Sequence, residues 1–455
     1  MKLRWFTLFL VAIVMMMGYV FWDIASPLST TLRTPVSEGG MGWTSAEYGF
    51  YAGSYSIFNI FLLMLFFGGI ILDKAGIRFT GLLATGMMLV GAFVNYHAIA
   101  SISPSTQVHL AFTLFGLIPS DMKLQVLVSA LGFGLFGVGC DITGITVSKI
   151  VTKWFTGHEL ASAMGVQVAM ARLGTASAIS FSPLIAATFG LSAPLLVGAV
   201  FLLFGFVLFI TYVFMDRRFD KKHIASNAST PKDSQPLSIV LKGVILILRN
   251  PGFWLIAFLC VFFYSSVRPF LKFATDVLVS KYGITETTAG WIVSILPYGT
   301  IVLTPLFGSI YDRIGRGATL MLAGCSLVAV CHLLMALPIA TTPWLAAIIM
   351  FLHGIAFSLV PSALWPSVPK IVPLSQLGTA YSIIYYIQNL GLMLVPMFVG
   401  NMIDEAQQPS STVTPTMLVF ALFGILAVVT SILLLILDKR QHYGLEKANI
   451  KKSKQ

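Results

Sequence analysis

Long apolar stretches separated by short polar turns run through the whole chain, and they constrain its fold more than any other feature. A helix that crosses the hydrocarbon core of a bilayer needs about 20 apolar residues. Only 10% of the 455 residues are charged, against about 25% in soluble proteins, so most of the outer surface must face lipid. The sequence therefore predicts an all-α membrane protein and excludes a water-soluble enzyme.

Charged and Gly/Pro-rich segments divide the apolar stretches into twelve predicted transmembrane helices. The first six are 4–27, 46–72, 77–101, 124–151, 156–187 and 190–215. The last six are 249–275, 285–311, 317–338, 342–369, 376–403 and 412–437. We predict an N-terminal six-helix half at 1–215, a cytoplasmic linker at 216–248, a C-terminal half at 249–438 and a basic cytoplasmic tail at 439–455.

The basic residues are distributed unequally between the two sides of the predicted membrane. If the N-terminus is cytoplasmic, 22 of the 28 lysines and arginines fall in cytoplasmic segments, as the positive-inside rule requires. This orientation places both termini in the cytoplasm and accounts for the net charge of +11. Because no domain presents these charges together, we predict no nucleic-acid partner.

The sequence offers no cluster of residues suited to catalysis or to metal binding. No group of His, Cys or carboxylate side chains has the spacing of a metal site, and no nucleophile lies beside a base and an orienting group. The four cysteines lie inside apolar stretches, which argues against a disulfide framework. We expect no cofactor, no metal and no enzymatic activity.

One motif occurs twice, after the second and after the eighth predicted helix. Residues 69–78 read GIILDKAGIR and residues 308–316 read GSIYDRIGR. This pattern resembles the loop 2–3 signature of the major facilitator superfamily, although a generic cytoplasmic turn also carries such charges. The resemblance implies a major facilitator fold of two pseudo-symmetric six-helix bundles. It also implies that charged residues of these loops control the conformation, and these gating residues are Asp73, Arg78, Asp312 and Arg316.

A glycine motif inside the fourth predicted helix imitates a dinucleotide-binding fingerprint. Residues 132–137 read GFGLFG, but no strand precedes them and the segment lies within a membrane span. We interpret the glycines as a surface on which a neighbouring helix packs closely.

Two opposite charges are predicted at one depth in neighbouring helices. Asp141 lies 12 residues before Lys153 and Arg172 lies 15 residues after Gly157. At about 1.5 Å per residue both are about 20 Å from the same membrane boundary. If both side chains face a cavity, they would bind a zwitterion, and the guanidinium of Arg172 would hold the carboxylate of the ligand. A salt bridge that merely joins the two helices is the alternative.

The seventh predicted helix carries a second set of polar residues. Tyr264, Arg268 and Lys272 are spaced by four and share one face. We expect Pro269 to break or kink the helix there, and we expect Lys272 to extend to the membrane surface. We expect Arg268 and Tyr264 to contact the substrate.

Three more titratable residues have two interpretations each. Asp23 either lines the cavity as part of the substrate site or lies at the outer interface. His332 and His353 either relay protons or pack between helices, and packing is the more common role of a lone membrane histidine.

Two stretches narrow the resemblance. The first reads WFTGHEL at 154–160 and continues through 165–174, and the second includes LWP at 364–366, QLGTAY at 376–381 and IQNLG at 387–391. They resemble the major facilitator domain-containing protein 1 family of lysosomal dipeptide transporters. The resemblance implies dipeptide uniport in which Asp141 holds the amino terminus and Arg172 the carboxylate. Asp replaces an expected Glu at position 141.

We therefore expect a monomeric carrier in the lipid bilayer that moves small zwitterions, and dipeptides in particular, by alternating access. The repeated loops would latch the outward-facing state. An organic-anion or amino-acid carrier and a non-transporting sensor or partner-binding scaffold are the alternatives. Because only Met1 to Arg4 precede the first apolar stretch, which starts at Trp5, we expect a cell (inner) membrane rather than a lysosome.

Overall fold

The computed structural model describes residues 2–155, 159–223, 245–338, 342–373, 376–405 and 409–448. It confirms the predicted all-α membrane fold. Among these residues, eleven helices are long and apolar enough to cross a membrane.

The N half is formed by the elements that precede residue 224. In chain order they are α1 (Lys2–Asp23), η1 (Ser26–Leu28), α2 (Ser29–Arg33), η2 (Val36–Glu38), α3 (Ser45–Ser54), α4 (Ile57–Phe61), α5 (Met64–Lys74), α6 (Gly76–Ser101), β1 (Gln107–His109), β2 (Asp121–Lys123), α7 (Leu124–Phe155), α8 (Leu160–Phe189) and α9 (Ala193–His223).

The C half consists of six long helices. They are α11 (Pro251–Tyr282), α12 (Glu286–Ile314), α13 (Gly317–Ala336), α14 (Pro343–Ile371), α15 (Leu377–Glu405) and α16 (Pro409–Gln441). Within this half α13 packs against α14 and α16, and α12 packs against α14.

The second predicted membrane helix is interrupted twice. The sequence pattern predicts one helix over 46–72, whereas the structure has α3, α4 and α5 in succession. The second interruption includes Leu63, whose φ of 51° is left-handed. Such a conformation is uncommon for a residue other than glycine. Apolar composition cannot reveal this break, because the interrupted residues are as apolar as those of a continuous helix.

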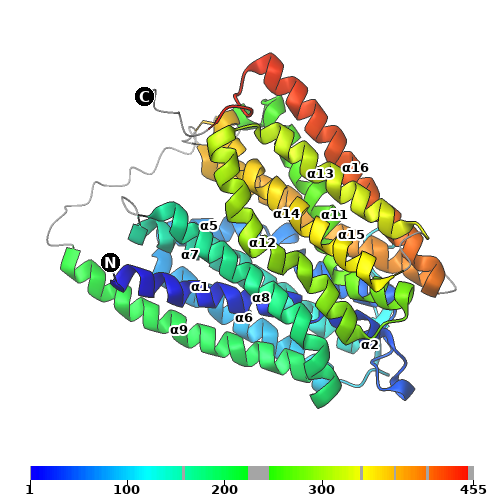
Figure 1. The fold of residues 1–455 in the computed structure, drawn as a ribbon. Coiled ribbons are helices and arrows are strands. Elements are labelled where there is room, and N and C mark those ends of the chain that lie inside the picture. The colour runs from blue at the N-terminus through cyan, green and yellow to red at the C-terminus, as the bar shows by residue number, and fades with distance from the viewer. Residues whose placement is uncertain are drawn as a thin grey trace.

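The two halves meet along two pairs of helices. Between halves, α8 packs against α12, and α3 packs against α15. The bundles lie together at the end that holds α2 and diverge toward the end that holds the N-terminus (Figure 1). We call these the α2 end and the terminal end.

Polar contacts between the halves concentrate at the α2 end. The guanidinium of Arg33 lies 2.7 Å from the carboxylate of Asp276, and the hydroxyl of Thr31 donates to Glu286 at 2.5 Å. Two backbone amides at the start of α3 donate to Asp404 at 2.6 and 2.7 Å. These contacts hold the α2 end closed.

A short hairpin that the sequence did not predict covers part of the α2 end. Its strands β1 and β2 pair antiparallel, with Val108 opposite Met122. The hairpin loop is tied to the C half because the amide of Asn401 donates to the carbonyl of Leu117 at 2.8 Å. On its exposed side, a hydrogen bond with His109 lowers the pKa of Asp121.

The glycine motif of α7 is a close-packing surface, as predicted. A Cβ atom on Gly132 would lie 2.7 Å from the carbonyl oxygen of Gly91 on α6, and one on Gly137 would overlap the carbonyl oxygen of Tyr55. These contacts bring the interrupted second span against α7. All four cysteines of the chain are buried and free, and Cys140 follows this motif.

The last described residues fold back onto the terminal end of the C half. Asp438 accepts hydrogen bonds from the backbone amides of Gly444 and Leu445 at 2.9 and 3.0 Å. The carboxylate of Glu446 accepts from the backbone amide and hydroxyl of Thr319 at 2.9 and 2.8 Å, in the first turn of α13. A carboxylate at a helix N-terminus is stabilised by the unpaired amides there.

Candidate functional site

Five charged side chains from four helices lie within the membrane-spanning part of the bundle. They are Asp23 on α1, Asp141 on α7, Arg172 on α8, and Arg268 and Lys272 on α11. Three of them are almost completely buried, with exposed fractions of 1% for Asp23 and 8% for Arg268 and Lys272. A charge in this position is costly, so it must be paired or have a function.

The ammonium of Lys272 is held inside the protein. It donates to the carbonyl of Trp22 at 2.6 Å, to Asp23 at 2.8 Å and to the hydroxyl of Ser26 at 3.0 Å. The expectation that Lys272 extends to the membrane surface is therefore wrong. Its physical reason is that three acceptors at the end of α1 satisfy all three donors, whereas extension would leave Asp23 buried without this partner.

Asp23 joins the two halves from within. Its carboxylate lies 2.8 Å from Lys272 and 3.8 Å from Arg268, both on α11. Asp23 is therefore buried between the halves, where it also lines a small cavity.

The proline of α11 does not break the helix. The structure contains one α-helix from Pro251 to Tyr282 with Pro269 inside it, so of the predicted break or kink the break does not occur. A proline removes one backbone donor, and the packing of α11 between α15 and α16 keeps the helix continuous. The face of α11 that carries Tyr264 and Arg268 contacts aromatic residues. The hydroxyl of Tyr264 accepts a hydrogen bond from the indole of Trp365 at 3.2 Å.

Asp141 is bound by residues of the interrupted second span. The hydroxyl of Tyr55 donates to its Oδ1 at 2.7 Å, and the amide of Asn59 donates to its Oδ2 at 2.6 Å. Asp141 and Arg172 are both described, and no ion pair joins them. The alternative of a simple salt bridge between α7 and α8 is therefore wrong for this conformation.

Arg172 and Arg268 share one aromatic ring. The guanidinium carbons of Arg172 and Arg268 lie 4.5 and 5.5 Å from the ring centre of Phe357 on α14. Arg268 also lies 4.7 Å from the ring centre of Trp22, which stacks on Tyr55 at 4.3 Å. These contacts connect both arginines with the partners of Asp141.

A small cavity lies among these residues. Its volume is about 20 Å³, little more than one water molecule needs. It is lined by Trp22, Asp23, Ala52, Tyr55, Arg268, Pro269, Lys272, Leu392 and Pro396. A ligand larger than water does not fit into this cavity unless its walls move.

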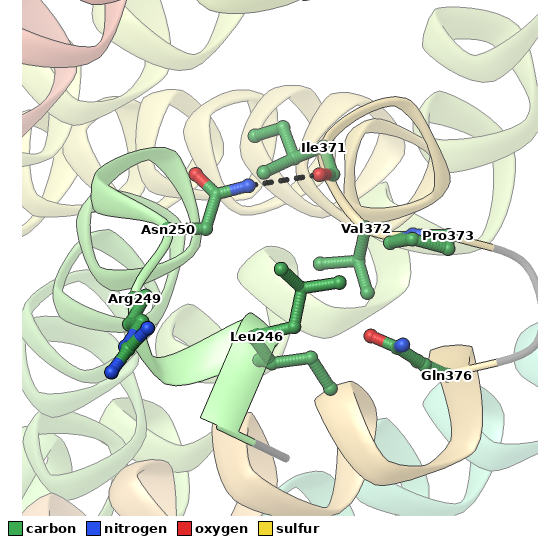
Figure 2. Close-up of a pocket in the computed structure, with 8 residues that line it drawn as sticks. Leu246, Arg249, Asn250, Ile371, Val372, Pro373 and Gln376 are labelled. Atoms are coloured by element: carbon green, nitrogen blue, oxygen red, sulfur yellow. Dashed lines mark hydrogen bonds between the residues drawn. The ribbon is translucent and has the colours of Figure 1, made fainter. Parts of the chain in front are cut away.

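A larger cavity of about 310 Å³ lies elsewhere, at the terminal end of the C half. Figure 2 shows its wall, where the amide of Asn250 donates to the carbonyl of Ile371 at 3.0 Å and Arg249 lies at the edge. None of the residues that we predicted for the substrate site lines this cavity.

Arg78, a predicted gating residue of the N half, pairs within that half. Arg78 binds Asp216 at 2.7 Å and also binds Asp220. Lys153 lies 2.8 Å from each of the same two carboxylates. The side chain of Asp73 lies outside the described residues.

Arg316, a predicted gating residue of the C half, lies beside the folded-back tail. Arg316 has a left-handed φ of 61°, and its backbone amide donates to the carbonyl of Glu446 at 3.0 Å. Asp312 lies at the end of α12 and has an interaction partner. The tail therefore contacts the second copy of the repeated motif.

The two membrane histidines contact each other in the core of the C half. The Nε2 atoms of His332 and His353 are 3.4 Å apart. Nε2 of His332 also lies 3.1 Å from the carbonyl of Ser266, and Nδ1 of His353 lies 3.2 Å from the carbonyl of Ile349. Both are completely buried, which agrees with a packing role.

Sequence reasoning missed the uncharged part of the site. Tyr55, Asn59, Trp22 and Phe357 lie in apolar stretches, where an aromatic residue or a single amide is as common in packing as in binding. The one available signal was Asn59, a polar side chain in a predicted membrane span.

The fold and the site together define a class. Two helical bundles enclose buried charges of both signs on facing helices, which is the architecture of a multi-pass membrane carrier. The sequence profile described as Major Facilitator Superfamily matches residues 8–275 and 253–454. The chain belongs to the major facilitator superfamily of membrane transporters, which confirms the resemblance of the repeated motif.

Known proteins support this assignment. The chain is 26% identical to the human lysosomal dipeptide transporter MFSD1 over 76% of this chain and 69% of the relative. It is 29% identical to the Gallus gallus protein of that name over 64% of this chain and 65% of the relative. The solved structure of the nucleoside transporter NupG (D323A mutant) has a TM-score of 0.68 and 15% identity, over 94% of this chain and 99% of that one.

Proposed function

We propose that this protein transports dipeptides by uniport through alternating access. The observation that carries the proposal is the separation of Asp141 from Arg172, which leaves a carboxylate and a guanidinium bound only to uncharged partners. A zwitterion supplies both missing charges. The name of the MFSD1 relatives supports a dipeptide as that zwitterion.

In this proposal Asp141 binds the ligand's ammonium and Arg172 binds its carboxylate. Arg268 and Tyr264 lie on α11, and their aromatic neighbour Phe357 contacts both arginines. Asp23 keeps Lys272 and Arg268 in place rather than contacting the ammonium, because Lys272 already occupies it.

Alternating access requires the two ends to open in turn. The closed α2 end supports a state in which the terminal end gives access to the site. The halves 1–215 and 249–438, joined by the linker 216–248 and followed by the tail 439–455, would rock about the buried charges. Asp73 and Arg78 with Asp312 and Arg316 would latch the terminal end in the opposite state.

We further propose that the carrier acts as a monomer in a cell membrane, with both termini in the cytoplasm. The excess of basic residues at the terminal end supports this orientation. It makes the state described here inward-facing. The transport cycle includes no covalent chemistry.

An organic-anion or amino-acid carrier is the second candidate. The observation that favours it is the pair of arginines around Phe357, which could bind one anion between them. Reversing the charge at position 141 distinguishes a dipeptide carrier from an anion carrier. Asp141→Lys should abolish dipeptide transport, whereas an anion carrier should tolerate it or bind its ligand more tightly.

The main test is counterflow of a labelled dipeptide in proteoliposomes. Saturable exchange should occur with the parent and fall at least about 100-fold in Arg172→Ala, because the carboxylate loses its charged hydrogen bonds. Arg249→Ala is the matched control, since Arg249 lies at the edge of the other cavity, and it should exchange like the parent. Absence of exchange and of competition by dipeptides would disprove the proposed substrate.

A further inference from the structure

The short helix α4 and its neighbour Tyr55 carry every hydrogen bond that Asp141 receives from the second span. Tyr55 and Asn59 are four residues apart, so they lie on one face of a helical segment. They donate to different oxygens of Asp141. Both donors are uncharged and buried, with exposed fractions of 3% and 1%.

These two donors occupy the positions that a ligand ammonium would need. An ammonium binds a carboxylate most strongly when its N–H groups donate directly to the carboxylate oxygens. In this structure the hydroxyl of Tyr55 and the amide of Asn59 already donate to the two oxygens of Asp141. The adjoining cavity of about 20 Å³ is lined by Tyr55 and is too small for a ligand ammonium with its attached carbon atoms.

The arrangement leaves one polar atom without a partner. The Oδ1 atom of Asn59 is buried and accepts no hydrogen bond from the described residues. A buried acceptor without a donor is unfavourable. The amide nitrogen of Asn59 donates to Asp141 while its amide oxygen has no hydrogen-bond donor. Such an incompletely satisfied arrangement is easier for a ligand to displace.

The segment 55–63 lies between two interruptions of the second span. Helix α3 ends at Ser54, before Tyr55, and α4 ends at Phe61, before the left-handed Leu63. The helices α1, α11 and α15, which also line the cavity, are continuous. A rearrangement of 55–63 therefore breaks fewer backbone hydrogen bonds than a rearrangement within these helices.

The segment also contacts the other half of the molecule. The hydroxyl of Ser56 donates to Asn389 on α15 at 2.6 Å. A movement that releases Asp141 therefore changes a contact between the two halves. This contact lies between the closed α2 end and the diverging terminal end.

We propose that Tyr55 and Asn59 are specificity-determining residues that hold Asp141 in the ligand-free protein, and that a ligand ammonium displaces them as segment 55–63 withdraws. The inference rests on the proposed function, because it assigns Asp141 to the ammonium. It goes further by naming what the ligand must displace and which segment responds. A ligand without an ammonium cannot replace the hydrogen bonds that Tyr55 and Asn59 donate to Asp141, so its affinity does not depend on them.

The first test is Tyr55→Phe in the counterflow assay. The ring that stacks on Trp22 remains, and only the hydroxyl is lost. Because the ligand no longer has to displace this donor, KM for a dipeptide should fall about five-fold, the value of one net hydrogen bond. Competition by the N-acetylated form of the same dipeptide should be unchanged.

Tyr51→Phe is the matched control. Tyr51 lies one turn earlier on α3, is equally buried, and its hydroxyl accepts from Asn95 rather than binding Asp141. Its removal should leave KM unchanged. A raised or unchanged KM in Tyr55→Phe, or an equal effect on the N-acetylated competitor, would overturn the inference while leaving dipeptide transport established.

The second test uses the parent protein and needs no variant. Amide hydrogen exchange in 55–63 should increase when a saturating dipeptide is added, while exchange in 45–54 should not. Protection of 55–63 by the dipeptide would contradict the proposed withdrawal. If dipeptides are not exchanged by the parent at all, the proposed function itself has failed.

Discussion

At the scale of single residues, Lys272 shows how the protein stabilises a charge within the membrane. Its three acceptors come from the last turn of α1 and the 3₁₀ turn that follows. The ammonium therefore fastens α11 to α1 across the boundary of the two halves. Loss of the ammonium would leave Asp23 with Arg268 at 3.8 Å as its remaining ion pair.

Lys272→Met should destabilise the protein by about 3 kcal/mol or more, because it leaves a buried carboxylate without its main partner. Thermal unfolding in detergent measures this loss. The control is Lys281→Met, because the ammonium of Lys281 donates to the carbonyls of Met335 and Leu337. The double variant Asp23→Asn/Lys272→Met should recover most of the loss, and failure to recover would show that the pairing is not its cause.

Charged residues were easier to predict from sequence than the residues that contact them. Asp141, Arg172 and Arg268 stand out because an ionisable side chain in an apolar stretch is rare. The position of the Lys272 ammonium was not predictable, because it depends on acceptors 246 to 250 residues away in the chain. Trp22 and Phe357 were not predictable either, since their types are ordinary in a membrane helix.

At the scale of elements, helix existence follows from the sequence but helix continuity does not. The length of each apolar stretch determines that a helix crosses the membrane. Continuity depends on local hydrogen bonds and on packing, so α11 is continuous through Pro269. The second span breaks without any proline or glycine between Ser54 and Met64.

The interruption before α5 gives a prediction about Leu63. Leu63→Gly should raise stability by about 1 kcal/mol, because glycine adopts a left-handed φ without a steric penalty. Leu63→Val should lower it by more, since a β-branched residue is least suited to that conformation. Thermal unfolding compares the two. Leu62→Gly, at an ordinary φ of −101°, should not stabilise, and an equal gain there would refute the explanation.

At the scale of the whole molecule, the α2 end holds the two halves together. Arg33 with Asp276, and Thr31 with Glu286, connect the short helix α2 to α11 and α12. The α8–α12 and α3–α15 pairs provide the apolar contact between the halves. The population of the closed α2 end therefore depends on a few polar contacts that can be changed one at a time.

Arg33→Asp should shift the population away from the closed α2 end, because it places two carboxylates together. Spin labels on exposed residues of each half at this end should then report longer distances. The double variant Arg33→Asp/Asp276→Arg should restore the distances of the parent. If both variants keep the short distances, the ion pair does not control closure.

The burial of the cysteines has a practical consequence for observing the carrier at work. Cys140 directly precedes Asp141 and is 5% exposed, whereas Cys325 and Cys331 are completely buried in the C half. A water-soluble alkylating reagent can reach Cys140 only when the centre of the molecule admits water. The unmodified chain thus carries its own chemical reporter of how often the site opens, with two distant thiols as internal references.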